Sequence, residues 1–155
     1  MQSIIKAVLL GGALSLSAAT ASAPALAQNA AQKQPAASDA KREASVAAVR
    51  IHADWCPSCK ALDPKLAEAI AGTSNLPIKH VRFDYTDRNA DRLWDELREA
   101  GYNDAIGQAL DGKIKTGRLV LIDASTGALI DQVASTASVQ DIEAALKDAV
   151  QDVSA

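Results

Sequence analysis

The sequence predicts a layered α/β domain over residues 46–155, with its elements in the order βαβαββα. Short apolar runs with strand character alternate along this part of the chain with longer segments whose apolar residues recur at helical spacing. Such alternation is typical of parallel strands joined by helical crossovers. Near the C-terminus, only a short turn at 125–127 separates two strand-like runs, which predicts an antiparallel hairpin. We therefore expect a central mixed sheet flanked by helices.

The first four elements are predicted as two strands that each lead into a helix. The first strand is almost wholly apolar, which predicts a buried position, whereas the second alternates apolar and polar residues. Both helices carry leucines at helical spacing, Leu62 and Leu66 in one and Leu93 and Leu97 in the other. The predicted ranges are 46–53 and 78–85 for the strands and 56–71 and 89–100 for the helices.

The last three elements are a strand at 119–122, its hairpin partner at 128–133 and a final helix. Ser138 suits the N-cap of that helix because its hydroxyl can accept a hydrogen bond from a backbone N–H of the first turn. Residues 102–117 carry no clear pattern, and a short helical turn near 104–110 is one interpretation.

The first 27 residues have the layout of a secretory signal peptide. An apolar stretch of small residues follows one positive charge, and Ala25-Leu26-Ala27 forms a small-x-small cleavage signal before Gln28. An uncleaved membrane anchor is the alternative, but glycines and serines dilute the apolar stretch and make it a poor bilayer span. Residues 28–45 contain no large apolar side chain and are predicted to be a flexible linker. We therefore expect export, with a bacterial periplasm as the destination.

The composition describes a mildly acidic chain with a formal net charge of −3. It contains no basic patch with interleaved aromatic residues, so a nucleic acid is not an expected partner. We expect a monomer.

The only two cysteines, Cys56 and Cys59, lie three residues apart between the first predicted strand and helix. On a helical first turn they share one face and can close a small disulfide ring. Because so short a ring removes little entropy from the unfolded chain, the pair is more typical of a redox switch than of a structural cross-link. A zinc site is an alternative, but it would normally need four protein ligands, and only His52 and His80 could join the cysteines. Two unreactive thiols are the third interpretation.

The position of each cysteine suggests its role. The N-terminal sulfur lies where the free N–H groups at a helix start favour an anion, so we assign Cys56 as the attacking nucleophile. Cys59, one turn inside the helix and expected to be more buried, would resolve the mixed disulfide. Pro57 suits a first helical turn. Lys60 adds a nearby positive charge, and Trp55 offers a flat apolar surface to a partner.

The segment 49–64 resembles the active-site strand and helix of the thioredoxin family. The likeness comprises Trp55-Cys56-Pro57-Ser58-Cys59-Lys60 and extends to Pro64, where the family has a helix-kinking proline. Because a proline inside a helix costs about 3 kcal/mol, a proline at this offset is a specific signal. The inner dipeptide, Pro57-Ser58, replaces the family's commonest Gly-Pro and would tune the redox potential. The resemblance implies a three-layer thioredoxin-like fold and a thiol–disulfide oxidoreductase that needs no cofactor beyond its redox-active disulfide.

The sequence departs from the family at Arg50, where the family has a buried aspartate that assists proton movement at the second cysteine. An arginine stays protonated and cannot act as a base. Its charge near the sulfurs would stabilise a thiolate and make the pair more oxidising. The other interpretation, which the sequence slightly favours, is a structural Arg50 paired with a carboxylate such as Asp84. For the neighbouring His52, a packed or solvated imidazole is preferred to a proton-handling role.

A second departure concerns the loop before the hairpin, where the resemblance places Thr116 and Gly117 at the family's cis-proline position. Glycine permits unusual backbone angles but does not enforce a cis bond, so docking of substrates at this loop is expected to differ. In the family this proline also discourages metal capture. Its loss keeps open a copper site formed by Cys56, Cys59 and His52, since thiolates suit Cu(I).

Three functions therefore stand as hypotheses. The leading one is an exported oxidoreductase that exchanges disulfides with protein cysteine pairs, in a direction that the sequence leaves open. As a reductase it would need an electron-donating membrane redox protein, because a compartment that preserves disulfides does not recycle a dithiol. The alternatives are a copper carrier with a thioredoxin fold and a redox-inactive interaction domain.

Overall fold

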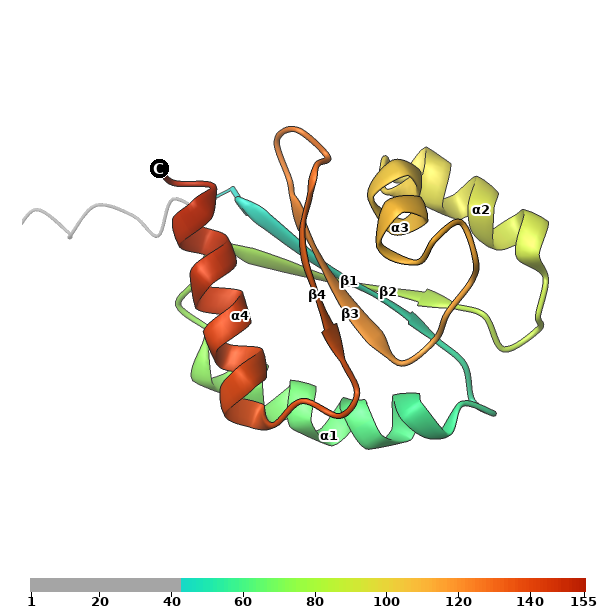
Figure 1. The fold of residues 1–155 in the computed structure, drawn as a ribbon, viewed down its shortest axis with the longest axis horizontal. Helices are drawn as coiled ribbons and strands as arrows, with labels where there is room; N and C mark the ends of the chain where they lie inside the picture. Colours follow the sequence, from blue (N-terminus) through green and yellow to red (C-terminus); the bar gives the residue numbers. More distant parts are fainter. Residues whose placement is uncertain (1–42) are drawn as a thin grey trace, which may run out of the picture. The chain divides into compact units, whose positions relative to one another are not determined.

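Four strands form one mixed sheet in the order β2-β1-β3-β4 in the computed structural model, which describes residues 43–155 (Figure 1). β1 pairs in parallel with β2 and antiparallel with β3, and β3 pairs antiparallel with β4. The strands are β1 (Val46–His52), β2 (Ile78–Asp84), β3 (Arg118–Asp123) and β4 (Leu129–Ala134). The predicted parallel crossover and final hairpin are both present, and the predicted α/β class with a central mixed sheet is confirmed. The predicted signal peptide at 1–27 and all but the last three residues of the predicted linker at 28–45 lie outside the described residues.

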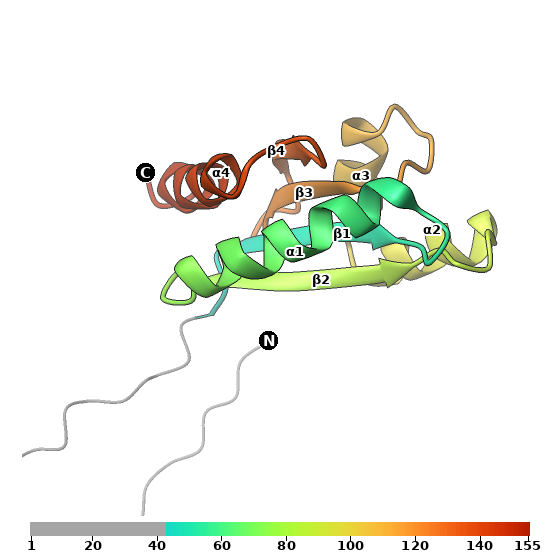
Figure 2. The same ribbon diagram turned by 90° about the horizontal axis from the view of Figure 1, so that it is seen from below.

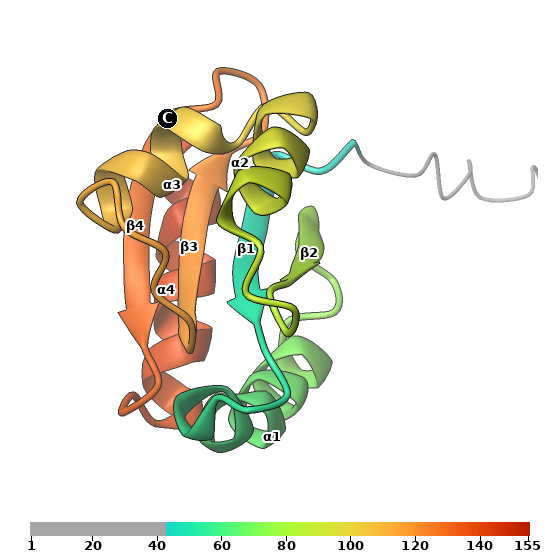
Figure 3. The same ribbon diagram turned by 90° about the vertical axis from the view of Figure 1, so that its right-hand side faces the viewer.

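Helices cover both faces of this sheet (Figures 2 and 3). The helices are α1 (Pro57–Gly72), α2 (Ala90–Glu99), α3 (Asn103–Ala109) and α4 (Val139–Asp152). Successive side chains of a strand point to opposite faces, so Val46 and Ala48 of β1 pack in the cluster with α1 and α4. Ala47 and Val49 pack in the cluster with α2 and α3. The central position of β1 therefore explains why its sequence is apolar on both faces.

The short helix α3 occupies part of the region 102–117, which shows no clear pattern of apolar residues. It buries Ala105, Ile106 and Ala109, so the element order is βαβααββα, with one helix more than predicted. No side-chain hydrogen bond caps it at Tyr102, and a helix of seven residues is too short to show a clear period. The helix depends on the packing of its apolar residues against the sheet.

Side chains cap the starts of α2 and α4. The cap at Ser138 was predicted, whereas Asn89, predicted as the first residue of its helix, is instead the N-cap. Asn89 accepts a hydrogen bond from the Arg92 backbone N–H (3.0 Å) before α2, and Ser138 and Asp141 form a capping box at α4. The hydrogen bonds that Asp141 receives from Ser138 lower the pKa of this carboxyl below its usual range. At α1 the prediction was wrong by one residue, because Cys56 is the N-cap and lies outside the helix itself.

Lys65, the residue after the internal Pro64, anchors α1, the helix that begins at the cysteine pair. The Nζ of Lys65 donates hydrogen bonds to the backbone carbonyls of Ser135 (2.5 Å) and Ala137 (2.6 Å), in the connection between β4 and α4. These two bonds hold α1 against the segment that leads into its neighbour α4.

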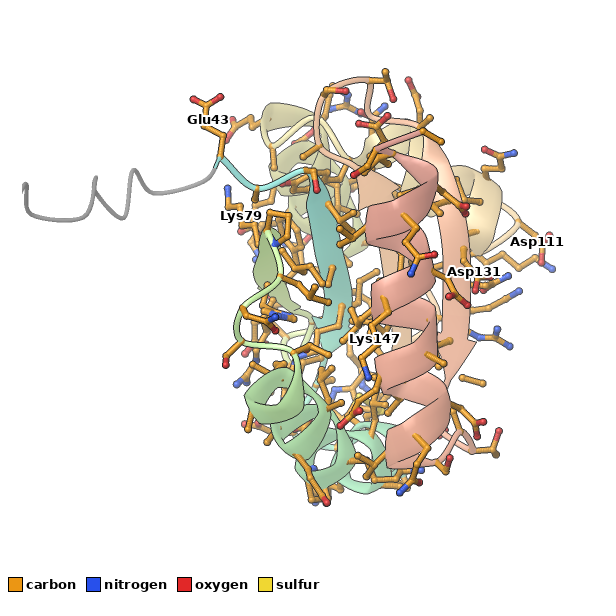
Figure 4. All side chains as sticks on the ribbon, turned by 90° about the vertical axis from the view of Figure 1, so that its left-hand side faces the viewer. Glu43, Lys79, Asp111, Asp131 and Lys147 are labelled. Atoms are coloured by element: carbon orange, nitrogen blue, oxygen red, sulfur yellow. A yellow bond between two sulfur atoms is a disulfide. The ribbon has the colours of Figure 1, made fainter. Side chains whose placement is uncertain are left out.

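The two edge strands, β2 and β4, both carry charged residues. Lys79 on β2 and Asp131 on β4 lie at opposite margins of the domain (Figure 4). Charges on edge strands oppose pairing with the sheet of another molecule. Within residues 43–155, every helix is too short or too polar to cross a bilayer.

Candidate active site

The two cysteines lie where the chain passes from β1 into α1, at one end of the sheet (Figure 3). They form a disulfide with their Cα atoms 5.3 Å apart. Cys56 has an extended backbone (φ −89°, ψ 110°) and caps α1, with Pro57 at the first helical position. The backbone N–H of Cys59 donates to the sulfur of Cys56 at 2.9 Å. A donor of the first helical turn therefore faces the sulfur that the sequence assigns as the nucleophile.

Burial does not distinguish the two cysteines in this disulfide form. Each is only 2% exposed, so the prediction that Cys59 would be the more buried of the two was wrong. The backbone N–H of Cys56 bonds to the carbonyl of Ala53 (3.0 Å), which curls the chain so that both sulfurs pack with that alanine. The residues around the pair are exposed: Trp55, Pro57, Ser58 and Lys60.

The loop before β3 closes over the cysteine turn at Gly117. This glycine has a φ of +74°, and a Cβ added to it would lie 2.4 Å from the Cβ of Ser58 and 3.2 Å from the backbone nitrogen of Cys59. Its N–H bonds to the carbonyl of Ile51 (3.4 Å), the same oxygen that lies 3.9 Å from the sulfur of Cys59. Thr116, half-buried, precedes it. The structure thus places this loop directly against the disulfide turn.

Trp55 is held at the surface beside the cysteines. The residue is 40% exposed, and its Nε1–H donates to the backbone carbonyl of Thr86 (3.0 Å). The Tyr85 ring meets it edge-on with centroids 6.1 Å apart, and the guanidinium of Arg88 lies 4.3 Å from the centre of the indole. The segment after β2 therefore orients Trp55 and places a positive charge over it.

Arg50 points from β1 toward α1 and forms an ion pair with Asp63. The suggested partner, Asp84, was wrong: its carboxylate instead accepts a hydrogen bond from the Thr86 backbone N–H (2.7 Å). The register explains this result, because Arg50 lies beside Arg82 on β2, whereas Asp84 lies beside His52.

His52 lies at the end of β1 with only 7% of its surface exposed. Its Nδ1 is 3.4 Å from Oδ2 of Asp63 and its Nε2 is 3.5 Å from Oδ1 of Asp54, but neither contact has hydrogen-bond geometry. Among the described residues, Nδ1 is the one buried side-chain nitrogen or oxygen without a hydrogen-bond partner. The carboxylate of Asp63 therefore lies between a guanidinium and a buried imidazole.

A family comparison agrees with this geometry. Residues 29–93 match the family model described as Thioredoxin, a match that includes β1, the cysteine turn, α1 and β2. The domain is thioredoxin-like. No curated protein matches the chain.

One solved structure of a thioredoxin-family protein supports this fold. A thiol:disulfide interchange protein of the thioredoxin family from Chlorobium tepidum TLS superposes with a TM-score of 0.50 at 18% identity, covering 72% of this chain and 83% of that one. Thioredoxin 2 from Pseudomonas aeruginosa PAO1 in its reduced form is 22% identical over 72% of this chain and 85% of its own, with a TM-score of 0.47. At such identities the likeness concerns the fold.

The alternative copper ligands are not assembled in this disulfide form. Within the part of the chain that the structure describes, no three His, Cys, Asp or Glu side chains are grouped so that they could hold a metal ion. Cys56 and Cys59 are joined to each other, and His52 faces Asp54 and Asp63.

Hydrogen bonds, burial and nearby charges lower the pKa of two groups around the site. Hydrogen bonds from Thr86, together with Arg82 close by, hold the pKa of Asp84 below its usual range. On the same face of β2, burial and the positive charge of Arg50 lower the pKa of His80.

Sequence reasoning did not identify Asp63 and Arg88 as part of the site. Asp63 had a usable signal, since it lies four residues after Cys59 and so shares its helix face. Arg88 gave no signal, because its contact with Trp55 depends on how the segment after β2 folds back in space.

Proposed function

We propose that this chain is an exported thiol–disulfide oxidoreductase that exchanges its Cys56–Cys59 disulfide with cysteine pairs of other proteins. One observation carries the proposal: the sulfur of Cys56 caps α1 and accepts a backbone hydrogen bond from its first turn. When the disulfide opens, the same donor and the helix dipole would stabilise a thiolate at this position. A thiolate, and not a thiol, attacks a partner's disulfide.

The surroundings of the pair support exchange with proteins. Trp55 presents an exposed ring beside the disulfide, with the charge of Arg88 above it, and a flat amphipathic surface of this kind suits a polypeptide partner. The direction of exchange follows from the potential of the pair relative to that of its partner. As a reductase, the protein would take electrons from a membrane redox protein.

The reaction is tested by trapping the mixed disulfide. The full chain with Cys59→Ser, incubated in reduced form with insulin as a disulfide-containing probe, should accumulate a covalent adduct through Cys56. The reason is that no second thiol is present to release it. Non-reducing electrophoresis and mass spectrometry measure the adduct, which dithiothreitol should remove.

The matched control is Cys56→Ser, which keeps the buried Cys59 and should give no adduct. The wild-type chain should reach a defined dithiol–disulfide equilibrium in a glutathione buffer and should accelerate the reduction of insulin by dithiothreitol. If it binds Cu(I) tightly but does neither, the proposal is wrong and the copper carrier takes its place. Equal adducts with both variants would overturn the assigned roles.

Export is tested separately. When the full chain is produced in a Gram-negative host, the protein in the periplasmic fraction should begin at Gln28, as measured by intact mass. A charged residue at the predicted cleavage signal, Ala27→Glu, should block cleavage and leave the longer chain with the membranes, because the signal requires a small residue there. Wild-type protein of full length in the membrane fraction would instead indicate the uncleaved anchor, and full-length protein in the cytosol would contradict export.

A further inference from the structure

We propose that His52 accepts the proton of the Cys59 thiol when Cys59 attacks the mixed disulfide, and returns it when the disulfide is opened again. The inference rests on the proposed function, because it assigns a proton acceptor to the resolving step of that exchange. Arg50, at the position where the family has an acidic residue, cannot fill this role since it stays protonated.

The first observation is the state of the imidazole. His52 is buried to more than nine-tenths, yet its Nδ1 has no hydrogen-bond partner. Buried polar atoms are paired in the great majority of cases, because an unpaired one reduces stability. A buried imidazole nitrogen without a hydrogen-bond partner can gain or release a proton without breaking a hydrogen bond.

The second observation is the position of the sulfur. The sulfur of Cys59 is 3.9 Å from the carbonyl oxygen of Ile51, and that carbonyl forms the peptide bond to His52. On α1, Asp63 follows Cys59 by four residues and so lies on the same helix face, one turn further on. Its Oδ2 is 3.4 Å from Nδ1 of the imidazole. The sulfur of Cys59 and the imidazole of His52 therefore both lie where β1 passes into α1, and the carboxylate of Asp63 lies against the imidazole.

The third observation is the charge around the imidazole. Protonated His52 would face a carboxylate at each nitrogen, Asp63 at Nδ1 and Asp54 at Nε2. The charged groups that surround it on β1, the following turn, α1 and β2 are three carboxylates and two guanidinium groups: Asp54, Asp63, Asp84, Arg50 and Arg82. These five groups have one negative charge in excess, and a protonated imidazole would neutralise it. The site can therefore hold the proton that Cys59 loses.

The thiol of Cys59 gives its proton to the imidazole, and the resulting thiolate attacks the sulfur of Cys56. A Cys56–Cys59 bond forms while the bond between Cys56 and the partner's sulfur breaks, and the partner leaves as a thiolate. Counted over both steps of the exchange, Cys56 and Cys59 together lose two electrons and the partner's disulfide gains them. In the reverse direction, Cys59 leaves as a thiolate and takes the proton back from His52.

The test separates the two cysteines by their kinetics. The reduced full chain is mixed with excess 5,5′-dithiobis(2-nitrobenzoate), whose coloured thiolate is released first by attack of Cys56 and then by attack of Cys59. The first rate depends on reagent concentration and the second does not. His52→Gln should slow the second release at least tenfold at neutral pH and leave the first within twofold, because general base catalysis contributes a factor of this size or more.

The pH profile distinguishes proton transfer from a structural role. In the wild-type chain the second rate should level off once the imidazole has lost its proton, whereas in His52→Gln it should keep rising with pH as the thiol ionises unaided. His52→Asn is made in parallel, and circular dichroism identifies which variant is folded.

Asp63→Asn should slow the second release of coloured thiolate and not the first. The matched control is His80→Gln, which removes the second histidine about 13 Å further along the sheet and should change neither phase.

Each outcome has a definite meaning. If the folded His52 variants resolve the mixed disulfide within twofold of the wild-type rate at every pH, or if His80→Gln gives the same loss, the inference is wrong while the proposed function stands. If both phases slow equally, His52 has only a structural role. If the wild-type chain releases a single coloured thiolate, Cys59 does not resolve, and the proposed function fails together with the inference.

Discussion

Gly117→Ala is expected to destabilise the oxidised domain by about 2–5 kcal/mol. Part of this cost arises because the residue has a φ of +74°, a conformation that costs an alanine about 1–2 kcal/mol. The rest arises because the new Cβ would lie 2.4 Å from that of Ser58, and overpacking of this kind costs about 1–3 kcal/mol. Urea unfolding followed by circular dichroism measures the change in the free energy of unfolding.

Gly112→Ala is the matched control for this substitution. Gly112 has a similar φ of +67°, but a Cβ there would meet nothing within 4 Å, so only the backbone cost of about 1–2 kcal/mol should appear. Adding Ser58→Gly to Gly117→Ala should recover part of the lost stability, since the closest clash is removed. Equal losses of stability at the two glycines would show that the loop can move away from Ser58 at little cost. The close approach of Gly117 to the cysteine turn would then not restrict the residue at this position.

The contact at Gly117 also explains how the loop reaches the cysteine turn without the cis-proline that the thioredoxin family has at this position. The N–H of Gly117 bonds to the carbonyl of Ile51, next to the sulfur of Cys59, and a proline has no N–H to offer. The loop therefore reaches the cysteine turn by a backbone hydrogen bond and the close approach that a glycine allows. We expect Gly117→Pro to lose this bond.

The sequence predicts the sheet and the long helices well because their signals are local. The apolar run that forms β1 and the leucine spacing of α1 and α2 are visible within one segment each. The helix α3 has seven residues and no side-chain cap, so its stability comes from partners such as Ile106 that local patterns do not reveal. Tertiary packing determined this element where intrinsic preference was weak.

The same distinction applies to the site. The cysteine pair and its helix are adjacent in the sequence, so their roles could be assigned before the structure was known. The partner of Arg50 could not be assigned, because it depends on the register of β1 with β2 and on which face of α1 looks inward. On the neighbouring strand, the residue beside Arg50 is Arg82, and Asp84 lies two positions further on. The carboxylate that reaches Arg50 is that of Asp63 on α1. Contacts that cross elements require the three-dimensional arrangement.

Asp63→Leu should destabilise the domain by about 1–3 kcal/mol, because it leaves Arg50 without its carboxylate. The Arg50 side chain is only 22% exposed, and a partly buried charge that loses its partner keeps its desolvation cost. Arg50→Met should cost a similar amount by leaving Asp63 unpaired on that side. The double variant should cost less than the sum of the two by about 0.5–3 kcal/mol, since residues in direct contact are coupled and it removes both charges together. Urea unfolding of the four chains provides this measurement.

The redox equilibrium of Arg50→Met distinguishes the two roles considered for this arginine. With its charge neutralised by Asp63, Arg50 should have little effect on the sulfurs, so removing it should move the potential of the cysteine pair by less than about 30 mV, which corresponds to about 1.4 kcal/mol. Equilibration with glutathione buffers measures this potential, and His80→Gln serves as the control for loss of a titratable group on the same face of the sheet. A larger shift toward a more reducing pair would show that the guanidinium acts on a thiolate in spite of its ion pair. In the unfolding experiment, additive losses of stability in the two single variants and the double variant would show that Arg50 and Asp63 are not coupled. The ion pair would then not explain why the domain accommodates an arginine at position 50.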